Sequence, residues 1–339
     1  MNQTEPVVIR HADLDDFYRV QKFLAEYWDD GNHIFVRSSE YFKYFQIVDG
    51  CFNVYLGEGK ISKKIYGICA YVICNRLQET DVQLNLLRVI KNNNFFDSLQ
   101  LLDYMKKDLN CRIFSACGVR PKVKVIYDFQ GYYTGKLDHY YRLADKEEYK
   151  IAVVKKKNIP QIEGGKYSLR SLPSFEDFKA RFNTSRYRHH KPYKDDWCIE
   201  HRYYKSMART YQVYGIDKGK DVYDSIIVLR EVCHNNAKIC KIVDFIGLDE
   251  DIGELSSEFQ RLIDENDYEY IDFYCTGISH SIMEKAGFIL RTSDDENIIP
   301  QLFEPFVQAN KDIYFFTNDI NGFHMYRGDS DQDRANIIE

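Results

Sequence analysis

The stretch Tyr270–Phe288, YIDFYCTGISHSIMEKAGF, reads as a buried strand that turns directly into a short amphipathic helix. Ile271, Phe273 and Cys275 alternate with polar or mixed neighbours, which is the two-residue period of a strand with two different faces. Ser279 suits the start of a helix. Apolar residues then recur at helical spacing: Ile278, Ile282, Met283 and Ala286. Gly287 suits the left-handed residue that ends a helix, so the stretch predicts one strand–helix unit.

A similar outline occurs earlier in the chain, in Arg112–Tyr133, RIFSACGVRPKVKVIYDFQGYY. It begins with an apolar strand and a Cys-Gly turn, and Pro121 stands near the expected start of a helix. Gly131 and two tyrosines follow. The sequence therefore predicts that the fold is duplicated.

These units resemble a known family. A strand followed by a short helix that ends in KAGF, after an earlier strand and a long amphipathic helix, resembles the C-terminal half of the acetyl-CoA-dependent N-acyltransferases of the GNAT superfamily. The resemblance covers Val7–Leu143 and Tyr167–Asn318. It implies an α/β (α+β) fold class, with a duplicated GNAT-like fold of two mixed, mainly antiparallel sheets and flanking helices.

The linker between the halves has the composition of a boundary, with Lys155–Lys157, Pro160 and Gly164–Gly165. We expect an N-terminal GNAT-like domain at residues 1–150 and a C-terminal one, with an acidic tail, at 151–339. In each half two strands should lie side by side and part towards the cofactor loop. These pairs are Val82–Ile90 with Arg112–Val119, and Lys238–Phe245 with Tyr270–Cys275.

Composition excludes several classes of protein. The chain has 339 residues, with 46 basic and 52 acidic ones, so its bulk charge makes a nucleic-acid partner unlikely. Nine scattered cysteines without a CxxC pair indicate reduced thiols, and no histidine spacing suggests a metal. No apolar run approaches the roughly 20 residues that span a bilayer, and the N-terminus resembles no signal peptide. We therefore expect a cytoplasmic protein without a membrane span.

The resemblance implies acetyl-CoA or another acyl-CoA as cofactor. A pyrophosphate is normally held by backbone amides of a glycine-rich loop that opens a helix. The first corresponding loop, Lys91–Phe95, has no glycine, although asparagine tolerates positive φ. The second, Gly247–Gly253, has glycines at its ends but three acids between them. The expected cofactor-binding residues, including the strand ends that hold the thioester carbonyl, are Val89, Asn92, Val243, Phe245, Gly247 and Gly253.

The resemblance also implies an acid that returns a proton to the CoA thiolate, commonly a tyrosine on the helix after the next strand. This position falls near Tyr127 in the first half. The matching helix of the second half has no tyrosine, and Tyr274 and His280 are the nearest substitutes. All three are candidate catalytic residues.

An unusual mixture of cations and rings occupies Arg186–Tyr214. Guanidinium groups bind phosphate and aromatic faces stack on rings, so this mixture suits a nucleotide-sugar or a similar ligand. The candidate substrate-binding residues here are Arg186, Arg188, Trp197, His201, Arg202 and Tyr204. The alternative is a pair of amphipathic helices that pack across the domain interface.

The C-terminal segment FHMYRGDSDQDRANIIE carries Asp329, Asp331 and Asp333 at alternate positions. The glycine and distal glutamate of a calcium loop are missing. We expect an ordered tail in which Asp331 and Arg334 face sugar hydroxyls, with a frayed terminus as the alternative. Tails of this kind resemble those of uncharacterised tandem GNAT-like proteins of bacterial surface-polysaccharide clusters.

Two functional hypotheses follow. The first is an acyl-CoA-dependent N-acyltransferase that acts on an amino group of an activated sugar or similar metabolite in surface-polysaccharide biosynthesis, with one half active. The second is a tandem fold without CoA that binds a nucleotide-sugar or glycan, or that uses aminoacyl-tRNA. Fold alone cannot choose between them, because function depends on the site.

Overall fold

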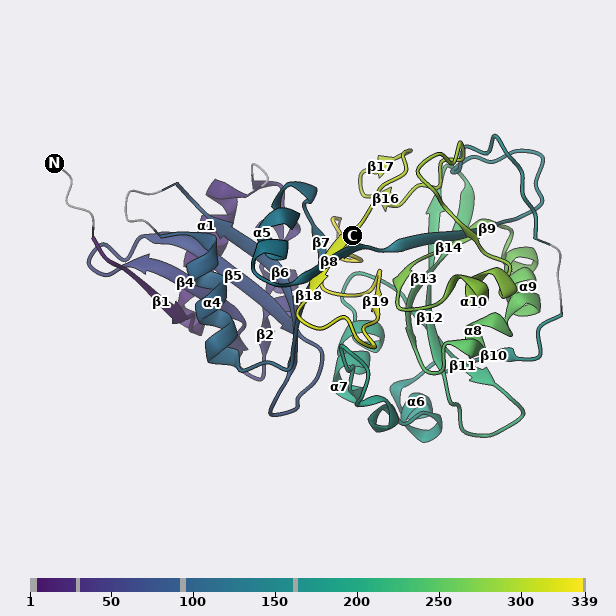
Figure 1. The fold of residues 1–339 in the computed structure, drawn as a ribbon, viewed down its shortest axis with the longest axis horizontal. Helices are drawn as coiled ribbons and strands as arrows, with labels where there is room; N and C mark the ends of the chain where they lie inside the picture. Colours follow the sequence, from purple (N-terminus) through teal and green to yellow (C-terminus); the bar gives the residue numbers. More distant parts are fainter. Residues whose placement is uncertain (1–4, 29–30, 92–95, 161–163, 338–339) are drawn as a thin grey trace.

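The computed structural model describes residues 5–28, 31–91, 96–160 and 164–337, and it consists of two α/β halves that lie side by side (Figure 1). Each half is built on one mixed sheet, and helices cover both faces of each sheet. The fold class predicted from the sequence is confirmed. No helix among the described residues is both long enough and apolar enough to cross a membrane.

The first sheet has seven strands, and all neighbours are antiparallel except β6 and β7. Their spatial order is β1 (Val7–His11), β4 (Val54–Gly59), β5 (Ile65–Ile73), β6 (Asp81–Val89), β7 (Ile113–Val119), β18 (Tyr314–Thr317) and β8 (Tyr133–Lys136).

The second sheet has eight strands and repeats this plan, because β13 and β14 form its parallel pair. Its order is β10 (Ser168–Ser171), β11 (Gln212–Asp217), β12 (Ile226–His234), β13 (Ala237–Ile246), β14 (Tyr268–Thr276), β9 (Asp138–Leu143) and β15 (Ile289–Leu290), with β19 (Met325–Tyr326) also on β14. Two small hairpins complete the strands: β2 (Ile47–Val48) with β3 (Cys51–Phe52), and β16 (Leu302–Phe303) with β17 (Phe306–Val307).

Each half lends one strand to the other. Strand β9, from the first half of the sequence, lies between β14 and β15, whereas β18, from near the C-terminus, lies between β7 and β8. Figure 1 shows β9 entering the green half and the yellow β18 lying beside the blue one. The division of the chain near residue 150 stays a prediction, and two strands cross it.

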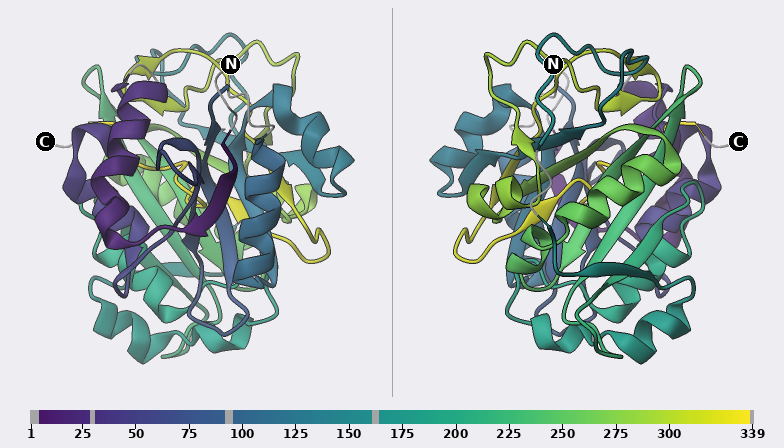
Figure 2. Two further views of the ribbon diagram at one scale, coloured as in Figure 1. Left: turned by 90° about the vertical axis from the view of Figure 1, so that its left-hand side faces the viewer. Right: turned by 90° about the vertical axis from the view of Figure 1, so that its right-hand side faces the viewer.

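Helices pack on the two faces of the first sheet as alternating side chains require (Figure 2, left). One face carries η1 (Leu14–Asp16), α1 (Phe17–Tyr27), α2 (Ile34–Arg37) and α3 (Ser39–Gln46). The other carries α4 (Ser98–Leu109), η3 (Pro121–Val123) and α5 (Lys124–Phe129). Val54 and Leu56 face the first group and Tyr55 faces the second, which is the period of a strand buried on both sides.

The second sheet is covered in the same way. One face packs against α8 (Glu250–Gly253), α9 (Ser256–Asn266) and α10 (His280–Lys285). The other packs against α6 (Phe175–Arg181), η4 (Thr184–Tyr187), α7 (Asp196–Ile199) and the π-helical turn η5 (Glu200–Tyr204). The helices α7 and η5 lie towards the boundary between the two halves (Figure 1).

The strand–helix unit predicted from Tyr270–Phe288 is confirmed. Strand β14 leads to α10, and Gly287 follows with φ of 82°. The amide of Gly287 donates to the carbonyl of Glu284 (2.8 Å), and the amide of Phe288 donates to that of Met283 (2.9 Å). These two hydrogen bonds form a Schellman motif, in which a left-handed residue follows the helix and the last carbonyls of the helix are satisfied. The first half repeats the unit with β7, α5 and Gly131, whose φ is also 82°.

Candidate active site

The two parallel strand pairs part at equivalent places, as predicted. In the first half the last paired residues are Leu84 and Ala116, and in the second they are Ile242 and Phe273. A β-bulge stands directly after each, because the register with the neighbouring antiparallel strand skips Asn85 in β6 and Val243 in β13. A bulge leaves its extra residue outside the ladder and bends the strand, which opens the sheet here. Asn85 and Val243 are therefore equivalent positions of the duplicated fold.

The gap between β6 and β7 holds a cleft of about 730 Å³, which is called the first cleft below. It is large enough for a sizeable ligand. Its wall comes from both strands and from α1, α4 and α5: Glu26, Tyr27, Trp28, Leu84, Asn85, Leu87, Arg88, Val89, Ser98, Leu99, Leu102, Ala116, Cys117, Gly118, Val119, Arg120, Val123, Ile126 and Tyr127. The wall combines apolar side chains from α4 and α5 with the cations Arg88 and Arg120.

Two residues predicted for different roles, Val89 and Tyr127, both line the first cleft. The ring of Tyr127 stacks on Phe316 of β18, with centroids 4.1 Å apart. Burial raises the pKa of the Tyr127 phenol well above its ordinary value, so the phenol keeps its proton at neutral pH. A buried, protonated phenol in a cleft wall can act as a proton donor.

The N-terminus of α4 is not an open anion-binding site. Asp97 caps this helix, and its carboxylate accepts hydrogen bonds from the amides of Leu99 and Gln100, both at 2.9 Å. These amides are therefore already satisfied by an acid. Asn92, predicted to bind the cofactor, lies outside the described residues.

The equivalent gap in the second half is filled by the chain itself. Residues 325–330, from β19 onward, enter between β13 and β14. The amide of Gly328 donates to the carbonyl of Val243 (2.7 Å), and that of Arg327 donates to Tyr274 (3.2 Å). The ring of Tyr326 stacks on Phe273. A cavity of only about 10 Å³ remains beside Phe245 and His324.

The insertion bonds to one of the residues predicted to bind the cofactor in the second half, and the others are held by different contacts. The carbonyl of Val243 is occupied, Phe245 is buried in the core, and a Cβ on Gly247 would collide with Ser225. Gly253 ends α8, at a distance from the first cleft in the fold.

The two second-half catalytic candidates also lie outside the first cleft. Tyr274 is fully buried, donates to the carbonyl of Lys311 (2.8 Å) and stacks on His139. His280 begins α10 and bonds to the hydroxyl of Tyr140. Neither lines any of the larger cavities among the described residues.

A second hollow of about 520 Å³, called the basic chamber below, adjoins the first cleft. The two share Trp28, Asn85, Cys117, Gly118, Val119 and Arg120. Asp331 and Arg334 of the tail, both predicted as substrate-binding, line the chamber and pair with each other at 2.7 Å. The tail is ordered and buried, since Asp329, Asp331 and Asp333 are each less than 5 % exposed. For the described part of the tail, the frayed alternative is therefore wrong.

Comparison with known proteins identifies the fold. No protein-family model and no curated protein matches the chain. Solved structures do match it, among them the following two. A GCN5-related N-acetyltransferase from Anabaena variabilis is 12 % identical, and the match covers 92 % of this chain and 72 % of that one with a TM-score of 0.53. A protein of unknown function from Enterococcus faecalis, described as a probable N-acyltransferase, is 8 % identical, with the same coverages and a TM-score of 0.57.

The chain has the GNAT fold, in duplicate. Within this fold the structure describes one open gap between parted parallel strands, and it lies in the first half. No group of three or more His, Cys, Asp or Glu side chains among the described residues is arranged to hold a metal ion.

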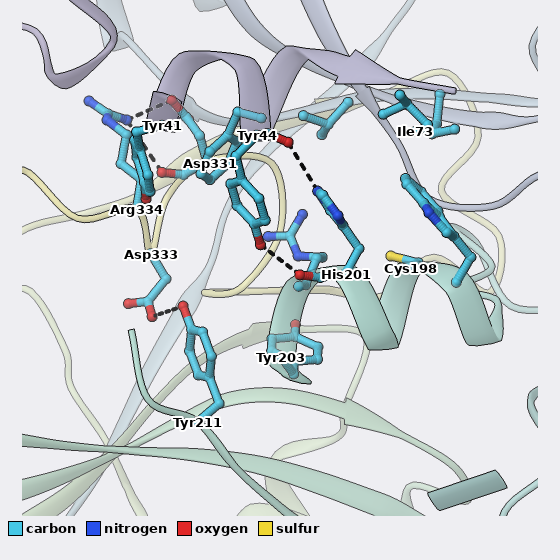
Figure 3. A pocket seen from close by; sticks show the side chains of 15 residues that line it. Tyr41, Tyr44, Ile73, Cys198, His201, Tyr203, Tyr211, Asp331, Asp333 and Arg334 are labelled. Carbon is cyan, nitrogen blue, oxygen red and sulfur yellow. Dashed lines mark hydrogen bonds and ion pairs between the residues drawn. The ribbon is translucent and has the colours of Figure 1, made fainter. Parts of the chain in front are cut away.

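The cation- and ring-rich segment Arg186–Tyr214 packs between the halves. Figure 3 shows Tyr44 of α3 bonded to the carbonyl of His201 (2.6 Å), and their rings stack with centroids 4.4 Å apart. Trp197, His201 and Arg202 line a cavity of only about 40 Å³, which has room for a few waters and not for a nucleotide.

The remaining candidates of this segment are held by other contacts. Arg186 pairs with Asp224 (2.8 Å), the carbonyl of Arg188 accepts from Arg112, and Tyr204 donates to the carbonyl of Leu172. The interface-packing alternative describes this segment better than a nucleotide-sugar site does.

Sequence reasoning missed the residues on which the cleft and chamber most depend. Asn85 was not recognised because a bulge is defined by cross-strand register, which sequence does not show. Arg230 and Gln301 stand in ordinary strand and loop contexts, and Arg327 was passed over within the tail. One available signal was Gly118, a glycine near the end of β7 that has φ of 85°.

Proposed function

We propose that this protein is an acyl-CoA-dependent N-acyltransferase whose active centre is the first cleft. The observation that carries the proposal is the open cleft of about 730 Å³ at the bulge of β6, in a fold shared with N-acetyltransferases. The equivalent second gap is filled by residues 325–330. The cofactor is acetyl-CoA or another acyl-CoA.

The residues of the first cleft suit this cofactor. Bound acyl-CoA supplies an acyl group activated as a thioester, with a thiolate as leaving group. The main chain of β6 beyond Asn85 is free of β7 and suits the amides of the pantetheine arm. Arg88 and Arg120 suit the phosphates. Their positive charges compensate for the negative charge of Asp97, which caps α4.

Two parts of the wall would act on the reacting group. The backbone at the bulge of Asn85 would hold the thioester carbonyl oxygen, since an oriented amide stabilises charge that develops there. Tyr127 would donate its phenolic proton to the leaving thiolate, for which its raised pKa keeps it in the protonated state.

The acceptor is a small molecule with an amino group. The finer prediction of an activated sugar rested mainly on Arg186–Tyr214, which packs between the halves, and that of surface-polysaccharide biosynthesis rested on the resemblance of the C-terminal tail. Both remain predictions to be tested against other amines.

Calorimetric titration with acetyl-CoA and free CoA tests the proposal. We expect one site per chain, because the second gap is occupied. Leu99→Trp places a larger ring in the cleft and should weaken binding roughly tenfold or more, an effect of about 1.4 kcal/mol. Tyr104→Trp is the matched control, since Tyr104 lies on α4 but does not line the cleft.

The proposal fails if the wild-type chain binds neither compound. Two sites per chain would contradict the assignment of the second half as a scaffold. Equal weakening by Leu99→Trp and Tyr104→Trp would show that α4 affects binding through stability alone.

A further inference from the structure

The basic chamber is more positively charged than its own carboxylates can balance. Its wall carries six basic side chains, Arg120, Arg209, Arg230, Lys311, Arg327 and Arg334, against three acidic ones, Glu304, Asp312 and Asp331. Each of these carboxylates already has a cationic partner: Glu304 pairs with Arg209, Asp331 with Arg334, and Asp312 with Arg291 outside the chamber. His33, also in the wall, adds no compensating charge, because burial lowers its pKa to about 3 and keeps it neutral.

The excess charge is concentrated at Arg230 of β12 and Arg327 of the tail. Both share one carboxylate, that of Asp333, at 2.8 and 3.0 Å. Asp333 also accepts a hydrogen bond from Tyr211 (3.0 Å, Figure 3), so both of its carboxylate oxygens already accept hydrogen bonds. The two arginines are 6 % and 5 % exposed. Two buried cations on one anion leave a net buried positive charge, which is costly unless another anion completes the group.

Both guanidinium groups retain unused donors. Arg230 gives one nitrogen, Nη2, to Asp333, and Arg327 gives Nε; no other nitrogen of either side chain bonds to a described residue. Gln301 is 4 % exposed, and its Oε1 likewise has no partner among the described residues. Buried polar groups in folded proteins are nearly always satisfied, so these positions indicate a ligand. The chamber therefore offers several cationic donors and one neutral acceptor.

The chamber meets the first cleft at the position where chemistry is expected. Asn85 and Cys117, which stand at the parting of β6 and β7, line both hollows. A molecule in the chamber can thus present a nucleophile to a group held at the bulge. The volume of about 520 Å³ suits a small metabolite.

We propose that the basic chamber binds the acyl acceptor and that this acceptor is an anionic amine, which carries a carboxylate or phosphate group held by Arg230 and Arg327. Gln301 accepts a hydrogen bond from an N–H or O–H of the same molecule. This inference rests on the proposed acyl transfer and adds the substrate class to it.

Three amines that differ mainly in their charged group test the inference. They are ethanolamine, β-alanine, which carries a carboxylate, and O-phosphoethanolamine, which carries a phosphate. Binding is measured on the full chain by calorimetry at constant ionic strength without CoA, and acyl transfer is then measured with acetyl-CoA. We expect at least one anionic amine to bind roughly tenfold or more tightly than ethanolamine, and to be the better acceptor. The comparison of β-alanine with O-phosphoethanolamine identifies the anionic group.

Variants locate the site. Gln301→Glu adds a carboxylate of nearly the same shape to the chamber wall that also carries Arg230 and Arg327. Its negative charge would compete with the anionic group of the amine, so it should weaken anionic amines roughly tenfold or more. Arg327→Lys keeps the positive charge but removes the planar guanidinium group, which can donate two parallel hydrogen bonds, so it should also weaken the binding of anionic amines. Arg186→Gln, at an exposed ion pair outside the chamber, is the control and should leave binding unchanged.

The outcomes separate the two proposals. If an anionic amine binds and Gln301→Glu abolishes binding while CoA does not bind, the chamber assignment stands and acyl-CoA chemistry fails. If CoA binds but no anionic amine binds better than ethanolamine, or Gln301→Glu binds as well as wild type, the inference is overturned.

Discussion

At the scale of single residues, two residues at equivalent bulges of the duplicated fold make different contacts. Asn85 and Val243 both stand at a bulge after the last parallel pair. The carbonyl of Val243 bonds to the tail, whereas Asn85 faces both hollows. The same backbone geometry therefore serves packing in one half and a binding site in the other.

Tyr127 is the residue whose chemistry is most directly testable. Tyr127→Phe removes the phenolic proton but keeps the ring that stacks on Phe316, so we expect kcat to fall by roughly 10²–10⁴ with little change in CoA affinity. Because burial raises its pKa, wild-type kcat should show no loss from Tyr127 ionisation below about pH 10. Steady-state kinetics across pH check both points. Unchanged kcat in Tyr127→Phe would exclude it as the acid.

Gly287 tests the strand–helix unit. A Cβ at this glycine would lie 2.3 Å from Nη1 of Arg142, which donates to the carbonyl of Ala286, and its φ of 82° disfavours a β-branched side chain. Gly287→Val should lower the free energy of unfolding by more than about 1 kcal/mol.

The control is Gly219→Val, where φ is also positive but no atom lies within 4 Å, so only the backbone strain is expected. Chemical denaturation measures both variants. An unchanged midpoint for Gly287→Val would contradict the placement.

At the scale of elements, the tail from β19 to residue 337 joins the halves. It fills the second gap, and it contacts the first sheet where Ser330 donates to the carbonyl of Leu84 (2.9 Å) and Gln332 donates to that of Cys117 (3.1 Å). One segment thus closes one site and forms a wall of the other.

The carboxylate of Asp333 anchors this tail. The guanidinium groups of Arg230 and Arg327 hold its pKa well below the ordinary value. A depressed pKa in the folded state stabilises the protein above the unfolded pKa of about 3.9, and this stability is lost as pH falls towards the folded value. Asp333→Asn leaves two buried cations and should cost about 3–5 kcal/mol at neutral pH.

Urea denaturation at neutral pH and at about pH 2.5 measures both the loss and its pH dependence, which should be shallower in Asp333→Asn than in wild type. Asp221→Asn is the control, since Asp221 is exposed. Equal stability of the two variants at neutral pH would contradict the anchoring role.

At the scale of the whole molecule, the exchange of β9 and β18 makes each sheet depend on the other half of the chain. Residues 1–150 alone lack β18, so β7 and β8 have no partner on that side, and residues 151–339 lack β9. Unpaired strand edges promote aggregation.

We therefore expect each fragment to be insoluble or unfolded by itself, and co-expression to give a one-to-one complex with the intact fold. Size-exclusion chromatography and circular dichroism check this. A folded, monomeric fragment from either half would show that the exchanged strand is dispensable.

The sequence by itself determined the parts of the structure that local patterns encode. The alternation in Ile271–Cys275, the helical spacing before Gly287 and the repeat of this outline at Arg112–Tyr133 predicted the strands, the caps and the duplication. These features depend on the side-chain period and on backbone preference, which act between residues close in the chain. Val89 and Tyr127, which were chosen from the order of elements, both line the first cleft, and their roles in binding and catalysis remain predictions.

Only the tertiary structure decided which half keeps an open site and what lies beside it. The tail fills the second gap through hydrogen bonds between residues such as Val243 and Gly328, which are far apart in sequence. The basic chamber gathers Arg120, Arg230, Gln301 and Arg327 from four separate segments. Burial, charge balance and unpaired donors arise only when distant segments meet, because the cost of an unpaired buried charge depends on its surroundings and not on its neighbours in the chain.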